Sequence, residues 1–504
     1  MVASPADWPM YRNNPLHTGV ATDVVPPSLS LKWKQTFTSP VVGSPVVVGP
    51  RVYAADSLGP LDAIDAATGN IIWSFIPVGT GSWLSSPAVA TVGGQTVIFV
   101  GRTDPDDKLY AIRDDGATSF KLWDSGALIT GSPESSPVVT TIAGTQVVIV
   151  GSLGNGLYAF VAATGALYPG WTTNPFTDGG KTGAFHSSPA ILGSTIFIGN
   201  DKPVLYAINL GNGIKLWDSA TTPTPTTITD LVVSSPAIAN VAGEDRVFVG
   251  SDDKHMYAFT AATGTLRWSQ PVGGKIRSSP ALATIPNPPV ACAPGPTLAV
   301  IFGSDDGNVY AMRASDGTPC WTFPSTGLKP FESSPAVSGQ TVYIGSDDFN
   351  FYAIDINTGT WQWSFPALDM VGGGLGPNPA VSGSTVYFAA GIGSTGDGKD
   401  KRLYAFEGPV ATTTLTSTVS TSSTTTIPVT QTSTVTTATA TVSSGTTTQM
   451  QTTTQTLTST VIASTVSVAP PGPGIPGFPI ESILMGLVGG LVALTLLERR
   501  RRRQ

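Results

Sequence analysis

The chain is short of cysteine, and this scarcity excludes several kinds of site at once. Its 504 residues include only Cys292 and Cys320. Neither a Cys-x-x-Cys-His haem motif nor a paired-cysteine zinc pattern can therefore form. The two cysteines are 28 positions apart, so they cannot form a disulfide between adjacent residues. Outside a cell we expect the two thiols to pair, whereas inside one we expect them to be inert and buried.

Charge is also scarce, and basic residues in particular are few along most of the chain. Charged residues make up 12%, and five of the 26 lysines and arginines form the run Arg499–Arg503. Residues before 410 carry 31 acidic and 21 basic side chains, a net charge of about −10. Nucleic-acid binding depends on basic surface, so an acidic body of this kind argues against a nucleic-acid partner.

Glycine and proline are abundant instead, and they accompany one sequence unit that recurs along the first 408 residues. There are 56 glycines and 42 prolines, which favours short strands joined by tight turns. The clearest copy of the unit is Ser333–Phe365. It reads as Ser-Ser-Pro-Ala, an apolar strand, a Gly-Ser-Asp-Asp turn, a Tyr-Ala strand, a Thr-Gly turn and a strand with tryptophan.

Three markers of the unit each occur eight times. The prolines of the Ser-Pro element are Pro45, Pro87, Pro137, Pro189, Pro236, Pro280, Pro335 and Pro379. The alanines of the Tyr-Ala element or its variant are Ala63, Ala111, Ala159, Ala207, Ala258, Ala311, Ala353 and Ala405. The tryptophans are Trp33, Trp73, Trp123, Trp171, Trp217, Trp268, Trp321 and Trp363. We expect these tryptophans to pack one repeat on the next rather than to surround a cofactor.

The order of the markers predicts how the repeats close into a ring. Trp33 precedes the first Ser-Pro element, whereas the last repeat ends at Glu407-Gly408 and lacks a fourth strand. Pairing the spare strand Leu31–Phe37 with the last repeat leaves no open edge. The sequence therefore predicts an all-β protein: an eight-bladed β-propeller of four-stranded antiparallel blades over residues 31–408, after a lead-in over residues 1–30. The Ser-Ser-Pro strand is expected nearest the axis.

The opening Asp7–Gly19, which reads DWPMYRNNPLHTG, and the repeat itself resemble the pyrroloquinoline-quinone-like (PQQ-like) propeller family. The resemblance covers roughly residues 7–408 and implies the propeller fold. That family includes quinone-dependent alcohol dehydrogenases, the bacterial outer-membrane assembly propeller lipoprotein and extracellular proteins without known chemistry. The resemblance therefore assigns no single function.

Residues 409–479 are predicted to form a disordered stalk with a Pro/Gly-rich end. Ala411–Val468 consists mostly of threonine, serine, valine and alanine and has no charged or aromatic residue. Such a segment cannot bury enough apolar surface to offset the entropy lost on folding. Its composition is typical of an O-glycosylated stalk, with an unmodified flexible linker as the alternative.

A single transmembrane helix is predicted over residues 480–497. This segment has one charge, Glu481, and spans about 27 Å as a helix, enough for the hydrocarbon core. The basic tail over residues 498–504 is then predicted to be cytoplasmic and the propeller extracellular. This arrangement resembles the C-terminal anchor of archaeal surface proteins. Because no export signal opens the chain, we expect either a start upstream or a signal already removed. The rival is a tail-anchored protein with a cytosolic propeller, which would have to translocate five arginines.

The residue before each Ser-Pro element is expected at the mouth of the axial channel. Around the ring these residues are Val42, Leu84, Glu134, His186, Val233, Arg277, Glu332 and Gly376. The four polar members, Glu134, His186, Arg277 and Glu332, are candidate ligand-binding residues. The alternative is that they pair with one another across a wet channel. No nucleophile or metal triad accompanies them, so we predict no catalytic residue.

Aspartate pairs fall in three of the turns between second and third strands, and they are better read as turn residues than as ligands. The pairs are Asp252-Asp253, Asp305-Asp306 and Asp347-Asp348. Asp305, Asp306, Asp347 and Asp348 remain weak candidates for calcium. Cys292 and Cys320 are expected at the same end of the sixth blade, where a disulfide between them is geometrically sensible.

Two functions from different classes follow. The first is a non-catalytic binding or scaffolding module outside the cell, contacting protein or glycan partners and needing no cofactor. The second is a membrane-anchored dehydrogenase that uses pyrroloquinoline quinone and Ca²⁺. Enzymes of that class resemble one another in having an adjacent cysteine pair, which this sequence lacks, so the first is favoured. A purely structural role in a surface layer is a third alternative.

Overall fold

The computed structural model describes residues 7–180, 182–221, 228–367, 377–390 and 401–408, and two short strands further on. Residues 1–411 form one compact unit and residues 412–504 a second. The predicted membrane helix at 480–497 and the basic tail at 498–504 lie outside the described residues. Nowhere in the described ranges is there a helix with the length and hydropathy of a membrane span.

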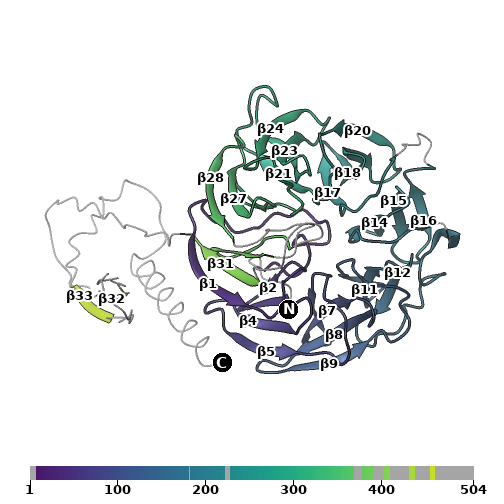
Figure 1. Ribbon diagram of the computed structural model, residues 1–504, viewed down its shortest axis with the longest axis horizontal. Helices are drawn as coiled ribbons and strands as arrows, with labels where there is room; N and C mark the ends of the chain where they lie inside the picture. The colour runs from purple at the N-terminus through teal and green to yellow at the C-terminus, as the bar shows by residue number, and fades with distance from the viewer. Residues whose placement is uncertain are drawn as a thin grey trace, which may run out of the picture. The chain divides into compact units, whose positions relative to one another are not determined.

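The first unit is a ring of eight antiparallel sheets, one per sequence repeat, so the predicted eight-bladed propeller is confirmed (Figure 1). Blades 1 and 2 contain β2 (Val46–Val48), β3 (Arg51–Ala55), β4 (Leu61–Asp65), β5 (Ile71–Phe75), β6 (Ala88–Val92), β7 (Gln95–Arg102), β8 (Lys108–Asp114) and β9 (Ser119–Asp124). Blades 3 and 4 contain β10 (Val138–Ile142), β11 (Thr145–Gly151), β12 (Leu157–Val161), β13 (Ala190–Leu192), β14 (Thr195–Gly199), β15 (Leu205–Asn209) and β16 (Lys215–Asp218).

The second half of the ring repeats the same order. Blades 5 and 6 contain β17 (Ala237–Val241), β18 (Glu244–Gly250), β19 (His255–Thr260), β20 (Leu266–Pro271), β21 (Ala281–Ile285), β22 (Thr297–Gly303), β23 (Asn308–Arg313) and β24 (Pro319–Pro324). Blades 7 and 8 contain β25 (Ala336–Ser338), β26 (Thr341–Gly345), β27 (Asn350–Asp355), β28 (Trp361–Pro366), β29 (Ala380–Ser382), β30 (Thr385–Ala389), β31 (Arg402–Glu407) and the N-terminal strand β1 (Ser30–Thr36).

The ring closes as the sequence predicts. Strand β1 pairs antiparallel with β31, from Ser30 opposite Glu407 to Thr36 opposite Arg402, and supplies the fourth strand of blade 8. Figure 1 shows the two strands side by side although they come from opposite ends of the propeller sequence. Neither end of the repeat array is left as an open sheet edge.

Blade 3 departs from the prediction of four strands, because it has only three. After β12 the chain makes isolated bridges at Leu167 and Phe176 instead of a continuous strand. Between them lies Pro175, which has no N–H to give to a ladder. The side chain of Asn174 substitutes for the missing backbone: its Nδ2 donates to the Ala159 carbonyl at 2.7 Å, and its Oδ1 accepts from the Ala159 N–H at 3.1 Å.

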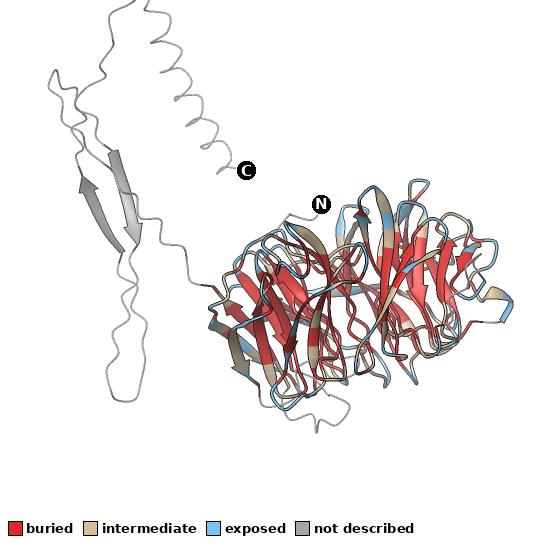
Figure 2. Cartoon of the chain, turned by 90° about the horizontal axis from the view of Figure 1, so that it is seen from above, coloured by how far each residue is buried: buried red, intermediate tan, exposed pale blue. Residues whose placement is uncertain are grey.

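The repeated tryptophans connect neighbouring blades, as predicted. The indole of Trp123, for example, donates from Nε1 to the Ala162 carbonyl of blade 3 at 2.9 Å. It also lies against Gly165 of the Thr-Gly turn, where a Cβ would come within 2.7 Å of the ring. The glycine therefore supplies both a left-handed backbone, with a φ of 72°, and room for the indole. Figure 2 shows that most residues of the blade strands are buried.

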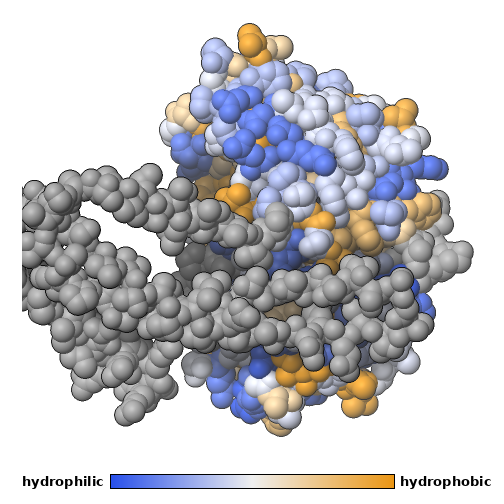
Figure 3. Space-filling view, turned by 90° about the vertical axis from the view of Figure 1, so that its left-hand side faces the viewer, coloured by the Kyte–Doolittle hydropathy of each residue, from blue (hydrophilic) through white to orange (hydrophobic). Residues whose placement is uncertain are grey.

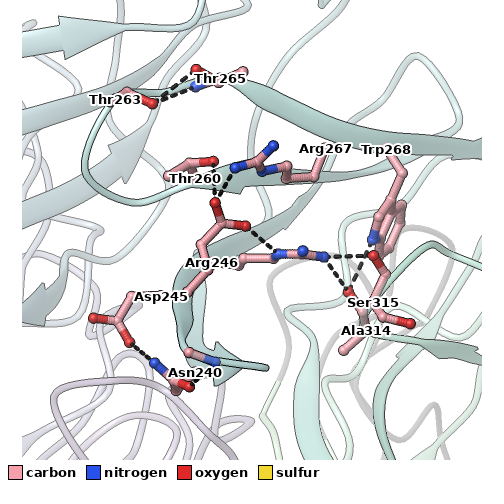
Figure 4. A network of polar contacts seen from close by, with 12 residues as sticks. Asn240, Asp245, Arg246, Thr260, Thr263, Thr265, Arg267, Trp268, Ala314 and Ser315 are labelled. Carbon is pink, nitrogen blue, oxygen red and sulfur yellow. Dashed lines mark hydrogen bonds and ion pairs between the residues drawn. The ribbon is translucent and has the colours of Figure 1, made fainter.

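Polar side chains reinforce some of these contacts between neighbouring blades. In Figure 4, Trp268 and Arg246 of blade 5 both reach the turn of blade 6, where the Ala314 carbonyl accepts from each of them. The Ser315 carbonyl accepts a second bond from Arg246 at 2.6 Å. The outer wall visible in Figure 3 is mixed, with hydrophobic residues scattered among hydrophilic ones.

The second unit contains one described feature. Strands β32 (Gln431–Thr436) and β33 (Thr454–Ser459) pair antiparallel within the predicted stalk. Threonine and valine are β-branched and favour strands. That residues 409–479 form a stalk stays a prediction. The rest of residues 409–479 lies outside the described part of the chain.

Candidate functional site

We call the end of the ring at which the innermost strands begin the loop face. It carries the links between blades and the turns between second and third strands. At this end the axial channel is lined by a closed circle of hydrogen bonds. The serine or asparagine before each repeat proline accepts a hydrogen bond from the backbone N–H of its counterpart in the preceding blade. The circle runs through Ser44, Ser86, Ser136, Ser188, Ser235, Ser279, Ser334 and Asn378, and then back to Ser44. The Ser-Ser-Pro strand was predicted nearest the axis, but this hydrogen-bonding role of its serines was missed.

The N-terminal lead-in closes the channel below that circle. Between Trp8 and Gly19 its carbonyl groups accept backbone hydrogen bonds from the innermost strands of six blades, at 2.7–2.9 Å. The donors are Val47, Val89, Ile191, Ile238, Leu282 and Val337. Tyr11 rises from the lead-in, and its hydroxyl makes a 2.8 Å hydrogen bond with Ser279 Oγ. The channel is thereby converted from an open pore into a cup that opens on the loop face.

Six of the eight predicted channel-mouth residues line this cup, with Tyr11 and the serine circle. They are Leu84, Glu134, His186, Val233, Arg277 and Glu332. Val42 is buried and does not take part, and Gly376 lies outside the described residues. The space open to the centres of water molecules is about 50 Å³. Whether these residues hold a ligand stays a prediction, but their shared location follows from the equivalent position each takes in its repeat.

The four charged candidates pair with their neighbours rather than across the channel. His186 Nδ1 lies 3.1 Å from Glu134 Oε2, and its Nε2 lies 3.6 Å from Asp201. Hydrogen bonds to Asp201 and Glu134 raise the pKa of His186 to about 9, so the ring is protonated at neutral pH. On the other side, Arg277 makes a forked contact with Asp252 and lies 3.5 Å from Glu332 Oε1.

The two members of each aspartate pair have different roles. The second aspartate accepts hydrogen bonds from its own turn, from the strand that follows and from the preceding link between blades. Asp306, for example, accepts from the backbone N–H groups of Asn308 and Gly273 and from the Tyr310 hydroxyl. Asp253 and Asp348 make the same set of contacts in their blades. This confirms the turn interpretation for the second aspartates. No group of three or more metal-ligating side chains in metal-binding positions occurs in the described ranges.

The first aspartates of blades 6 and 7, Asp305 and Asp347, lie close enough to Glu332 for their charges to act on it. Asp305 Oδ1, Asp347 Oδ1 and Glu332 Oε2 are buried, and no described group donates a hydrogen bond to any of them. Burial, reinforced by the charges of Asp347 and Asp305, raises the pKa of Glu332 to about 8. Burial raises the pKa of Asp347 to about 7 in the same way, with the charge of Asp305 adding to it. Sequence reasoning missed this group, because its members come from different positions of the repeat.

The predicted disulfide is present. Cys292, in the loop between β21 and β22, is bonded to Cys320 at the start of β24, with 4.5 Å between their Cα atoms. Both residues are buried and lie at the end of blade 6 opposite the loop face. The bond therefore fastens the outer strand of one blade and is remote from the cup.

The arrangement does not fit a quinone cofactor. Its space of about 50 Å³ is well below the roughly 300–1,000 Å³ of ordinary small-molecule sites. Both cysteines are bonded to each other at the far end of blade 6, so neither can lie against a cofactor ring. The charged side chains at the mouth are engaged with one another.

Fold and site together define an eight-bladed propeller whose axial channel is closed from one side by its own N-terminus. The chain belongs to the family whose model is described as outer membrane protein assembly factor BamB, which matches residues 26–219, 230–287 and 282–473. One curated relative, BamB of Yersinia pestis, is 24% identical over 157 residues. That match covers 30% of this chain and 36% of the relative, so the chain spans about a third of the relative's length.

Solved structures of both enzymes and assembly factors share the fold. Quinohemoprotein alcohol dehydrogenase from Comamonas testosteroni has a TM-score of 0.60 at 17% identity, covering 80% of this chain and 81% of that one. A europium-containing methanol dehydrogenase has a TM-score of 0.61 at 17% identity, covering 80% and 98%. BamB from Moraxella catarrhalis has a TM-score of 0.51 at 16% identity, covering 76% and 98%. At such identities the likeness concerns the fold alone.

Proposed function

We propose that this protein is a non-catalytic binding or scaffolding propeller whose loop face contacts a protein or glycan partner. We further propose that it is displayed outside the cell on the stalk over residues 409–479 and held by a single membrane span over residues 480–497. The basic tail after residue 498 would then be cytoplasmic. The apolar run and the arginine run in the sequence support this placement.

The observation that carries the binding role is the small size of the cup. With about 50 Å³ of space, it leaves room for a side-chain tip but not for a cofactor with several fused rings. Interaction is then left to the wide loop face around it. Membership in a family described as an assembly factor supports a protein partner in the first place.

Exposed apolar side chains in the loop-face segments support a protein partner too. Six large hydrophobic residues in these segments are more than 40% exposed. They are Leu58, Ile76, Val78, Leu128, Leu328 and Phe349. Apolar anchors surrounded by polar residues are common at protein interfaces.

The alternative is a PQQ-dependent dehydrogenase, which the fold of the alcohol and methanol dehydrogenases supports. A shared fold hosts unrelated functions, however, so it does not outweigh the size of the cup. Titration of the full-length chain with pyrroloquinoline quinone, with and without Ca²⁺, separates the two. A binding module shows no saturable rise in melting temperature and no dye reduction, whereas either of these results would establish the dehydrogenase.

Site-directed photocrosslinking in membranes of the source cell tests the partner. Val78 on the loop face and Val290 on the opposite face are 94% and 91% exposed, so they form a matched pair of positions. We expect a crosslinkable residue at Val78 to trap a discrete partner and the same residue at Val290 to trap none. Equal patterns from the two positions would contradict a loop-face binding role.

A further inference from the structure

Carboxyl groups are more numerous than cationic side chains in and behind the wall of the cup. Two carboxyl groups and the two cations His186 and Arg277 line it, and four further carboxyl groups lie behind them with Lys275 and Lys329. The carboxyl groups belong to Glu134, Asp201, Asp252, Asp305, Glu332 and Asp347. Both Lys275 and Arg277 are held by Asp252. With Glu332 ionised, above its pKa of about 8, the carboxylates outnumber the cations, and the electrostatic complement of the cup is then a cation.

Glu332 is the group on which such a cation would be expected to bind. It lines the cup, is only 6% exposed, and its Oε2 accepts no hydrogen bond from the described residues. Only its Oε1 has a cationic neighbour, Arg277, at 3.5 Å. A buried carboxyl oxygen without a donor is costly, so a ligand that supplies N–H donors and positive charge is favoured there.

The rim beside Glu332 carries two apolar residues in costly backbone conformations. Phe349 has a φ of 69° and Leu328 a φ of 52°, and their side chains are 45% and 61% exposed. At the position of Phe349 the turns of blades 5 and 6 have Lys254 and Gly307, also with positive φ. A bulky residue kept in a left-handed conformation and exposed to solvent points to a role outside the fold.

These two residues lie in segments that are bonded to each other and to the acidic group. The loop holding Leu328 is tied to the turn holding Phe349 by the bonds from Thr326 N–H to Asp348 and from Asp347 N–H to the Pro330 carbonyl, each 2.9 Å long. Asp347 itself raises the pKa of Glu332 by its charge. The apolar rim formed by Phe349 and Leu328 and the acidic wall of the cup at Glu332 are thus parts of one surface.

The size and composition of the cup select among cations. No metal-binding group occurs in the described ranges. A space of about 50 Å³ fits the ammonium or guanidinium tip of a side chain in place of a few waters. The rim then offers contact to an apolar neighbour of that side chain.

We propose that the cup binds the tip of a lysine or arginine side chain from a protein partner, with Glu332 as its main carboxylate. Phe349 and Leu328 contact an apolar residue next to that side chain. This inference rests on the proposed binding function and names the chemistry of the partner.

A pair of labelled peptides tests the proposal with the full-length chain. The probes are acetyl-Gly-Leu-Arg-Leu-Gly-amide and the same peptide with neutral citrulline in place of arginine, both followed by fluorescence anisotropy at pH 9, where Glu332 is ionised. We expect saturable binding of the arginine peptide at least tenfold tighter than that of the citrulline peptide. Butylguanidinium, as a free small cation, should bind at least tenfold more weakly than the peptide. Equal affinities within either pair, or no binding of the arginine peptide, would overturn the proposal.

Two variants connect the binding to named residues. At pH 9, where Glu332 is ionised, Glu332→Gln keeps the shape and removes the charge, so it should weaken binding of the arginine peptide at least tenfold. The control Asp115→Asn removes one charge from the exposed hairpin on the opposite face of blade 2 and should change nothing. Phe349→Asn should raise the melting temperature, because asparagine tolerates a positive φ, and should weaken peptide binding. Unchanged affinity in both site variants would refute the site.

Failure here and failure of the proposed function can be told apart. If Val78 traps a partner but the peptides do not bind, the loop face is a binding surface and the cup is not its cation site. If Val78 traps nothing, the proposed function fails whatever the peptides do.

Discussion

The Ser-Pro elements show how single residues determine the geometry of a ring. The serine before each proline uses its backbone N–H to donate to the next blade and its Oγ to accept from the preceding one. In the middle of the circle, Ser235 Oγ accepts from the Ser188 N–H at 2.8 Å, and both residues are at most 4% exposed. Each serine therefore satisfies a buried donor on the adjacent blade.

Replacing one of these serines tests that role. Ser235→Ala leaves the buried Ser188 N–H without an acceptor, so we expect the free energy of unfolding to fall by about 1–3 kcal/mol. Chemical denaturation of the propeller measures it. Ser194→Ala, at an exposed hairpin position, is the control and should stay within about 0.5 kcal/mol of the wild type. A loss as small at Ser235 as at Ser194 would show that the circle does not stabilise the ring.

A second prediction at this scale concerns pH. The native state raises the pKa of Glu332 to about 8, above its ordinary value of 4.5, chiefly by burial. Since the folded protein binds this proton more tightly than the unfolded chain, the free energy of unfolding falls as the pH rises from about 5 to 8. The charged groups facing Glu332 are Asp347, Asp305, Arg277 and Asp252.

The variant Glu332→Gln removes that dependence. At pH 3.5, below both pKa values, wild type and variant should have nearly equal stability, because Glu332 is then mostly protonated in the folded and in the unfolded chain. At pH 9 the variant should be more stable by on the order of 1–3 kcal/mol. Thermal unfolding at both pH values measures the difference. A variant that is less stable than wild type at pH 9 would mean that ionised Glu332 has a partner which offsets its burial.

At the scale of strands and blades, the repeat pattern predicted most of what is observed. The blade count, the turn aspartates and the tryptophan contacts each depend on equivalent positions, so any one copy informs the others. Blade 3 is the exception, since its Trp171 still donates to the next blade while the strand around it is absent. Asn174 replaces that strand through contacts with a residue 15 positions earlier, and no repeat pattern encodes such a substitution.

The disulfide of blade 6 is an element-scale device with a measurable effect. By loop-closure arithmetic, the bond between Cys292 and Cys320, 28 residues apart, contributes about 3–4 kcal/mol. We expect the double variant Cys292→Ser, Cys320→Ser to lower the free energy of unfolding by about that amount, and reductant to do the same to the wild type. Reductant should not affect the double variant. A wild type that is insensitive to reductant would contradict this role.

At the scale of the molecule, the sequence predicted the ring and its closing strand but not the cup. Closure follows from counting markers, since Trp33 comes before the first repeat and the last repeat lacks its strand. The closed end of the channel follows from contacts between a non-repeating lead-in and six separate blades, which no periodicity reveals. The raised pKa of Glu332 was hidden for a related reason, because besides burial it depends on the charges of Asp347 and Asp305, which come from other repeat positions.

The lead-in should therefore be as important to the ring as any blade. Removing residues 1–21 leaves β1 intact but takes away the carbonyl acceptors of six buried N–H groups on the innermost strands. Water can enter the opened channel and replace them in part, so we expect the ring to persist with a lower melting temperature. The loss should be roughly 0.5–1.5 kcal/mol for each hydrogen bond exchanged for water.

Hydrogen–deuterium exchange locates the effect. In the full chain the amides of Val89, Ile238 and Leu282 should exchange slowly, and in the truncated chain they should exchange much faster, since solvent reaches their side of the strand. Amides between second and third strands, such as those of the β18–β19 ladder, serve as the internal control and should keep their protection. Equal protection of the inner amides in both chains would show that the blades alone close the channel, and the cup would then not depend on the N-terminus.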